Sequence, residues 1–155
     1  MRKFRTMAVA ALSAAALFVG QAGMASAAAK GTSATGDGTV TQQPGTTYNF
    51  NFSAQTGKGG FTIFNTADRK NLVTAGKTDC IALIAPDTVA IIGTASNKNT
   101  DEDFNTYPKV LIVARDSSTL GDAISITGTT ETVCSSISSN TAVTPINGTI
   151  TISGT

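Results

Sequence analysis

Histidine and tryptophan are both missing from the 155 residues of this chain. Without an imidazole, Ser-His-Asp and Cys-His nucleophilic sites and His-ligated zinc sites are excluded, because each of them needs that ring as a base or a ligand. Without tryptophan, the usual stacking platform for sugar rings is missing as well. We therefore expect a protein that is not an enzyme and that carries no cofactor.

Charged residues are also few, at 14% of the chain, and neither sign dominates. Three of the eleven basic residues lie in the first five positions, which leaves eight basic against ten acidic residues and a net charge of −2 for the rest. These eight are scattered, so the sequence has no basic patch for nucleic acid or for an anionic membrane. Both classes of partner are disfavoured.

The most apolar part of the chain is its N-terminus. The basic residues Arg2, Lys3 and Arg5 precede an apolar run from Met7 to Gly20, and the small residues ASA follow at 25–27. This order is typical of a secretory signal peptide, here over residues 1–27. The alternative is a transmembrane anchor, which the short apolar core disfavours. We expect a secreted or extracellular protein, in contact with the cell surface or free, with no membrane span in its mature form.

Cysteine occurs only twice, as Cys80 and Cys134. Two cysteines in an exported chain predict one disulfide, because the compartments outside the cytoplasm are oxidising. The bond would close a loop of about 55 residues and stabilise the fold by about 4 kcal/mol in the chain-entropy model. The competing interpretation is two separate buried thiols.

The remaining sequence is rich in Thr, Ser, Val, Ile and Gly, which suit strands and turns rather than helices. Residues 28–37 are small and polar and are predicted to form a flexible leader. Beyond them, short apolar runs alternate with turn signals at the spacing of an all-β domain over residues 38–155. We predict a single-domain antiparallel β-barrel or closed β-sandwich of about eight to nine strands. The predicted strands lie within 47–54, 60–65, 78–85, 88–96, 108–116, 123–130 and 146–154, with weaker ones near Val40 and Leu72.

The apolar stretch at 76–96 is interrupted by Pro86-Asp87, so neither half is long enough to cross a membrane. Proline cannot donate a ladder hydrogen bond, and two strands joined by a tight turn explain the pattern. Both faces of the first half are apolar, with Ile81 and Leu83 opposite Ala82 and Ile84. The hairpin is therefore expected to be covered on both sides.

An acidic stretch at 97–105 is the one candidate for a metal site. Oxygen ligands alternate along it, and Ca²⁺ accepts six to eight such ligands. The candidate ligands are Asn99, Asp101, Asp103 and Asn105. Glu102 occupies the place of the turn glycine of a calcium hand, and Pro108 that of its closing glutamate, so a solvated loop without metal is favoured.

Aromatic side chains gather around the first predicted hairpin, and Phe50, Phe52 and Phe61 are the candidates for lining a ligand cavity inside a barrel. Small barrels are usually filled by their own side chains, so core packing is the competing role for these rings.

The succession of TYNFNFSA, TDCIALIAPDTVAIIGTA, VLIVARDSSTLGDAISI, VCSS and INGTITIS resembles a family of small secreted all-β proteins of actinobacteria and related bacteria, over about residues 47–153. That family has an F-x-F-x-A strand, one cysteine before an apolar strand that ends in glycine, an Asp-containing turn and a late second cysteine. The chain departs from it by carrying ARDSSTLGD where a V-D-N-G-like turn is usual. The family has no established activity, so the resemblance implies fold and secretion but no catalytic residue.

Three functions from different classes stay open. The leading hypothesis is a non-catalytic extracellular or cell-envelope protein that acts by surface contact or self-association. The second is a carrier of a small apolar ligand beside the three phenylalanines. The third is a carboxylate-dependent hydrolase that would use Asp101, Glu102, Asp103 or Asp116.

Overall fold

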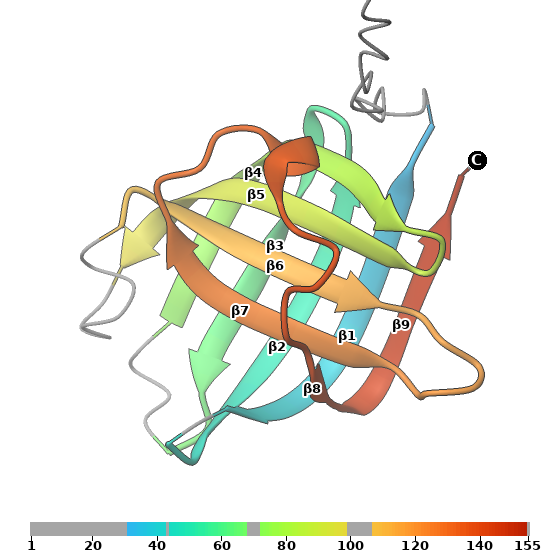
Figure 1. Ribbon diagram of the computed structural model, residues 1–155. Helices are drawn as coiled ribbons and strands as arrows, with labels where there is room; N and C mark the ends of the chain where they lie inside the picture. Colours follow the sequence, from blue (N-terminus) through green and yellow to red (C-terminus); the bar gives the residue numbers. More distant parts are fainter. Residues whose placement is uncertain (1–30, 43, 68–71, 99–106, 155) are drawn as a thin grey trace, which may run out of the picture.

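The computed structural model describes residues 31–42, 44–67, 72–98 and 107–154 (Figure 1). Nine β-strands run through these residues in the hydrogen-bonded order β8-β7-β6-β5-β4-β3-β2-β1-β9, and every neighbouring pair is antiparallel. The all-β, antiparallel prediction is confirmed. The elements are β1 (Ser33–Gln42), β2 (Thr46–Gln55), β3 (Lys58–Asn65), β4 (Leu72–Ala85), β5 (Thr88–Lys98), β6 (Lys109–Arg115), β7 (Ala123–Thr129), the 3-10 turn η1 (Cys134–Ser136), β8 (Thr144–Pro145) and β9 (Asn147–Ser153).

The ladder folds over into two layers whose strands cross in projection, with β9, β1, β2 and β3 behind β5, β6 and β7 (Figure 1). The long strand β4 takes part in this bend through register shifts against β5, one of them between Thr78 and Cys80. The main core lies between the layers, because apolar residues stand at alternate positions of each strand and point inward. Its buried members include Val40, Phe52, Ile63, Val89, Ile91, Ile112, Ile126 and Ile150.

The first strand begins earlier than the sequence predicts. Residues 28–37 were expected to form a flexible leader, but β1 starts at Ser33 and pairs with β2 on one side and β9 on the other. The prediction is wrong for residues 33–37, and the domain begins before residue 38. The physical reason is that Gly36 leaves room for the ring of Phe52 and the small side chain of Ala34 is buried in the core, so a segment with little apolar area still forms a central strand. Residues 1–27 lie outside the described part of the chain.

The predicted hairpin is present, with β4 and β5 joined at Pro86-Asp87. Val89 and Ile91 point into the main core, whereas Ala90 and Ile92 point to the opposite, outer face. There they pack in a second apolar cluster under the segment that follows β7, which crosses this face in Figure 1. Cover on both sides is confirmed.

The predicted disulfide is confirmed as well. Cys80 of β4 is bonded to Cys134 of η1, with 5.9 Å between their Cα atoms. The bond ties the segment after β7 to the outer face of β4. Among the described residues, no helix is long and apolar enough to cross a membrane.

Side chains bridge the seam between the two edges of the ladder, where no strand pairing joins β7 to β9 in the described residues. The Gln42 amide donates to the backbone oxygen of Ile126 (3.1 Å) and accepts from its N–H (3.0 Å). The Asp122 carboxylate accepts the N–H of Ile150 (2.7 Å), and the Asp116 carboxylate accepts that of Ile152 (3.0 Å). These contacts satisfy edge groups that would otherwise lack partners.

Candidate interaction surface

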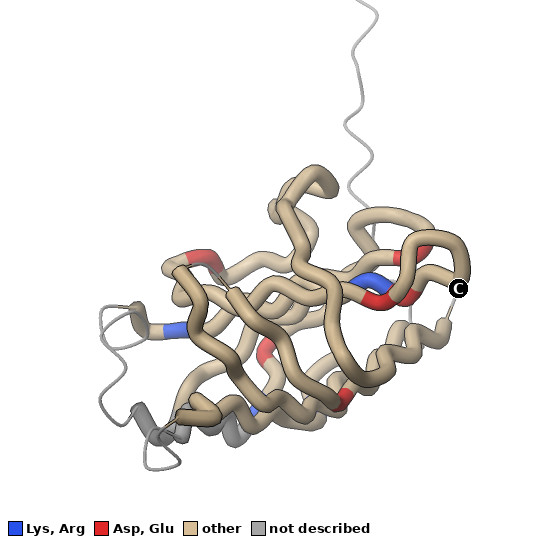
Figure 2. Tube along the Cα trace, turned by 90° about the horizontal axis from the view of Figure 1, so that it is seen from below, with Lys and Arg blue, Asp and Glu red and all other residues tan. Residues whose placement is uncertain are grey.

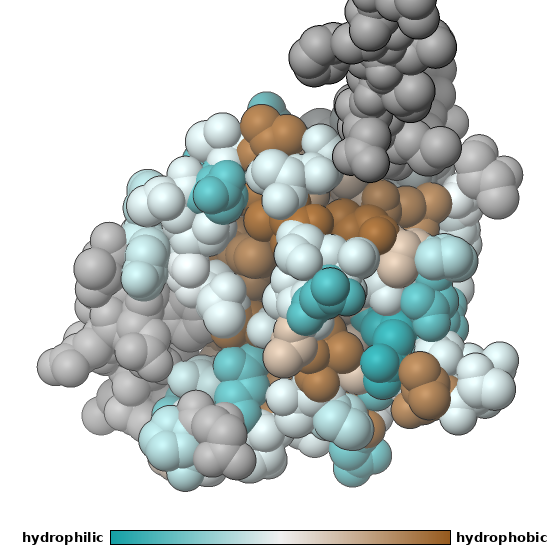
Figure 3. Space-filling model, in the orientation of Figure 1, coloured by the Kyte–Doolittle hydropathy of each residue, from teal (hydrophilic) through white to brown (hydrophobic). Residues whose placement is uncertain are grey.

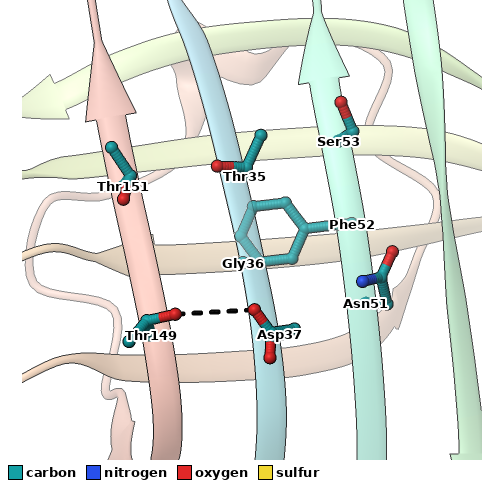
Figure 4. Close-up of a pocket in the computed structure, with 8 residues that line it drawn as sticks. All are labelled: Thr35, Gly36, Asp37, Asn51, Phe52, Ser53, Thr149 and Thr151. Carbon is teal, nitrogen blue, oxygen red and sulfur yellow. Dashed lines mark hydrogen bonds between the residues drawn. The ribbon is translucent and has the colours of Figure 1, made fainter.

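The outer face of β9, β1 and β2 carries an array of exposed polar side chains (Figure 4). It arises from strict alternation, because the residues between them on β1 and β2 are small or aromatic and point into the core. The array surrounds a shallow hollow of about 210 Å³. We call it the polar face, and its members are Thr35, Asp37, Asn51, Ser53, Thr149 and Thr151.

The polar face is a regular grid of two rows. Cross-strand pairing sets Thr151, Thr35 and Ser53 side by side in one row. The second row holds Thr149, Asp37 and Asn51 in the same order. Sheet geometry spaces neighbours in a row by about 4.8 Å and the two rows by about 6.8 Å. The strand pairing therefore fixes six hydrogen-bonding side chains in a repeating pattern.

A glycine lies between the two rows, and its missing side chain leaves room for an aromatic ring on the inner side of the sheet. Gly36 faces inward opposite Phe52, and a Cβ added to it would lie 2.5 Å from the Phe52 ring. The ring occupies the space where a side chain of β1 would stand, as Figure 4 shows. Phe52 is 2% exposed, so a buried aromatic ring lies beneath the polar side chains.

Two further glycines bring β1 and β9 together at the end of the grid. Gly38 and Gly148 are paired across the strands, and a Cβ on Gly38 would lie 2.5 Å from the backbone oxygen of Asn147. Because no side chain could fit between these backbones, the glycine pair allows β9 to approach closely.

The chemistry of the polar face is that of hydroxyls and amides. Asp37 is the one charged residue that lines the hollow, and it accepts a 3.5 Å hydrogen bond from the Thr149 hydroxyl. Charged residues are also sparse elsewhere along the described chain (Figure 2). The face can donate and accept many hydrogen bonds, and it presents little charge.

The candidate calcium ligands cannot be placed. Asn99, Asp101, Asp103 and Asn105, together with Glu102, lie outside the described residues. Within the described ranges, no three His, Cys, Asp or Glu side chains come together in a way that could hold a metal ion. Asn97 and Lys98 are the last residues of β5, so the interpretation of 97–105 as a solvated loop is wrong for these two residues. For residues 99–105 it stays a prediction.

The three candidate cavity residues lie in the main core. Phe50, Phe52 and Phe61 are 4%, 2% and 4% exposed, and they belong to one packed cluster. The rings of Phe50 and Phe52 stack with 6.2 Å between their centroids. A ligand at this position would have to displace rings that now contact their neighbours.

Asp116, the one candidate catalytic carboxylate inside the described ranges, has a structural partner. One of its oxygens accepts the backbone N–H of Ile152. Asp122, which the sequence analysis did not single out, accepts the N–H groups of both Ile150 and Ser117. The turn residues of ARDSSTLGD thus act as side-chain partners for the free edge of β9.

One ion pair stands on the outer face of the front layer. The ammonium of Lys109 lies 2.6 Å from a carboxylate oxygen of Asp79, which also accepts the hydroxyl of Thr94 at 2.9 Å. The hydrogen bond from Lys109 is the main reason that the pKa of Asp79 lies below its ordinary value. Burial opposes this effect and the Thr94 bond adds to it.

Comparison of the chain with models of protein families, with curated proteins and with solved structures gave no match. The resemblance to small secreted bacterial proteins therefore stays a prediction.

Proposed function

We propose that this protein is a secreted, non-catalytic β-domain that acts outside the cell or in the cell envelope as a structural or interaction protein, and that the polar face is its contact surface. The observation that carries the proposal is the difference between the two outer faces of the sheet. The outer face of β4 and β5 is apolar and lies under a stapled segment, whereas the polar face lies open. The disulfide is compatible with an oxidising extracellular location.

The partner that fits the polar face is a neutral, hydroxyl-rich surface such as a cell-envelope polysaccharide. A grid of hydroxyls and amides with one carboxylate offers little to a highly charged partner, and its donors and acceptors match those of a neutral hydroxyl-rich polymer. Each hydrogen bond exchanged with water contributes only about 1 kcal/mol, so binding would depend on many contacts along a repeating polymer. Weak, multivalent attachment suits an envelope protein.

Cosedimentation tests this proposal. The chain from residue 28 is mixed with insoluble peptidoglycan sacculi or with an insoluble neutral glucan, and the bound fraction is measured after centrifugation. Wild type should sediment with at least one of them. The variant Thr35→Ala/Ser53→Ala/Thr151→Ala should lose at least about tenfold in affinity, because a row of the grid is removed.

A matched variant controls for the loss of hydroxyls in general. Thr56→Ala/Thr130→Ala/Ser139→Ala removes three exposed hydroxyls outside the polar face, and it should bind like wild type. Equal binding by both triple variants, or no binding by wild type to either material, would refute the polar face as a contact surface for envelope polymers.

We also infer that the seam between β7 and β9 stays closed in solution, so that the domain is a barrel or closed sandwich. The support is the set of bonds from Gln42, Asp116 and Asp122 across the seam. Amide exchange of Ile126, Ile150 and Ile152 tests it. Protection comparable to that of strand-paired amides would agree with closure, and rapid exchange would show an open sheet.

A further inference from the structure

The outer face of β4, β5 and β6 is covered by residues 130–143, which we call the cover segment (Figure 1). Beneath it, Ala82, Ala90 and Ile92 are 0–2% exposed although they point away from the main core. Ile84 and Leu111 border this cluster and are half-buried. In Figure 3 the hydrophobic surface gathers over β4 and β5.

The cover segment itself adds only two side chains to this cluster, Cys134 and Ile137. Its hydrogen bonds are mostly internal, such as those from Ser136 to Val133 and from Thr141 to Ser138. The covalent bond to Cys80 is therefore the main link between the middle of the cover segment and the sheet.

The disulfide stands apart from the main core. Neither cysteine belongs to the large cluster between the two layers. The cover segment is also held at both ends, since it follows β7 and leads into β8, which pairs with β7. Loss of the disulfide would thus free the middle of a tethered loop and leave the strand ladder in place.

The bond can be reached from solvent. A hollow of about 170 Å³ opens beside it, lined by Cys80, Ala82, Val133 and Cys134 among others. Cys80 is half-buried, whereas Cys134 is only 2% exposed. Of the two cysteines, Cys80 is therefore the more accessible to a small thiol that enters the hollow.

We propose that the Cys80–Cys134 disulfide is a reducible clasp whose cleavage releases the cover segment and opens the apolar outer face of the sheet. A dithiol reductant supplies the electrons. Its thiolate attacks the Cys80 sulfur, the S–S bond breaks, and Cys134 leaves as a thiolate that takes up a proton. The second thiol of the reductant then displaces the Cys80 thiol and closes a cyclic disulfide, so that two electrons and two protons are transferred in all.

The redox state of the surroundings therefore sets the state of this face. In a reducing compartment the face is open, and oxidation closes it. This device does not rest on the proposed function, because it involves the outer face of β4, β5 and β6 and not the polar face.

Hydrogen exchange followed by mass spectrometry tests the clasp. The oxidised protein, the same protein in excess dithiothreitol, and the Cys80→Ala/Cys134→Ala variant are compared. Amides of residues 130–143 should exchange at least about tenfold faster in the latter two. Amides of β1, β2 and β9 should remain protected because the strand ladder stays folded, although their protection falls with the global free energy of unfolding. Binding of the dye ANS should rise in parallel.

Two results would overturn the proposal. If residues 130–143 exchange equally in all three samples, the cover segment does not depend on the disulfide. If the amides of β1, β2 and β9 become unprotected together with those of the cover segment, the disulfide holds the whole fold rather than a local cover. Ile84→Thr, which keeps β-branching but removes apolar area at the edge of the opened face, should reduce dye binding of the reduced protein, and unchanged binding would show that the dye binds elsewhere.

Discussion

The outer faces of the two layers are built from the same kind of strand, but one face is covered and the other is exposed to water. On β5 the outward positions carry Ala90 and Ile92, which are fully buried under the cover segment. On β1 the outward positions carry Thr35 and Asp37, which are exposed. The chain thus uses a loop and its only disulfide to shield one face and leaves the other in contact with water.

The difference shows that alternation alone does not decide what a strand faces. In β1 the alternation is between small and polar residues, and one apolar side is enough to join a core. In β4 and β5 both sides are apolar, so each side needs a partner, and the cover segment supplies the second one. An uncovered face that remains polar and carries a single carboxylate is then free for contact with a partner.

The largest expected effect comes from removing the clasp on the covered face. Cys80→Ala/Cys134→Ala should lower the free energy of unfolding by about 3–4 kcal/mol, because the bond closes a long loop in the unfolded chain and fastens the cover segment. Urea unfolding of the oxidised wild type and the variant measures this difference. A loss of less than about 1 kcal/mol would mean that the cover segment is held by other contacts.

The second effect concerns the seam that joins the edges of the two layers. Asp122→Ala removes the acceptor for the N–H groups of Ile150 and Ser117, and it should cost about 2 kcal/mol. Asp122→Asn keeps an oxygen acceptor and should cost less. Asp87→Ala serves as the control, since that carboxylate accepts only from the neighbouring Thr88 hydroxyl in the described residues. Equal stability of Asp122→Ala and wild type would contradict the role of the carboxylate.

A smaller effect depends on pH. The pKa of Asp79 is lower in the folded protein than in the unfolded chain, mainly because of Lys109, so the ion pair stabilises the fold above the unfolded value. This contribution is lost as the pH falls through the lowered folded pKa. Asp79→Asn should therefore be about 1 kcal/mol less stable than wild type at neutral pH, with the difference vanishing in strong acid. In a Lys109→Met background the same substitution should have almost no effect; a persistent difference would point to Thr94 instead.

Much of this architecture could be predicted from the sequence, because it depends on local patterns. Alternation of Tyr48, Phe50 and Phe52 with polar residues predicted β2, and Pro86-Asp87 predicted the turn of the central hairpin. Two cysteines in a chain that we expect to be exported predicted their pairing. The strand and the turn depend only on residues that are neighbours in the sequence, and the disulfide follows from the number of cysteines.

The rest depends on contacts between distant parts of the chain. In the sequence, Gly36 is typical of a flexible leader. Its role follows from the fold, in which the ring of Phe52 occupies the space beside it. Asp122 reads as a turn residue, and its role appears only once the edge of β9 lies beside it, 28 residues away in sequence. The polar face was missed for the same reason: the Thr-rich alternation of β1 was a usable signal, but its rows form only when β9 pairs with β1.

One pair of substitutions tests the contrast between the two faces most directly. Ala90→Lys and Thr35→Lys each place an ammonium at an outward position of a strand, one on the covered face and one on the polar face. The account predicts a loss of more than about 3 kcal/mol in unfolding free energy for Ala90→Lys, because a charge would be buried without a partner. It predicts a change within about 0.5 kcal/mol for Thr35→Lys, whose ammonium stays in water. Similar losses for the two variants, measured by urea unfolding, would contradict the account.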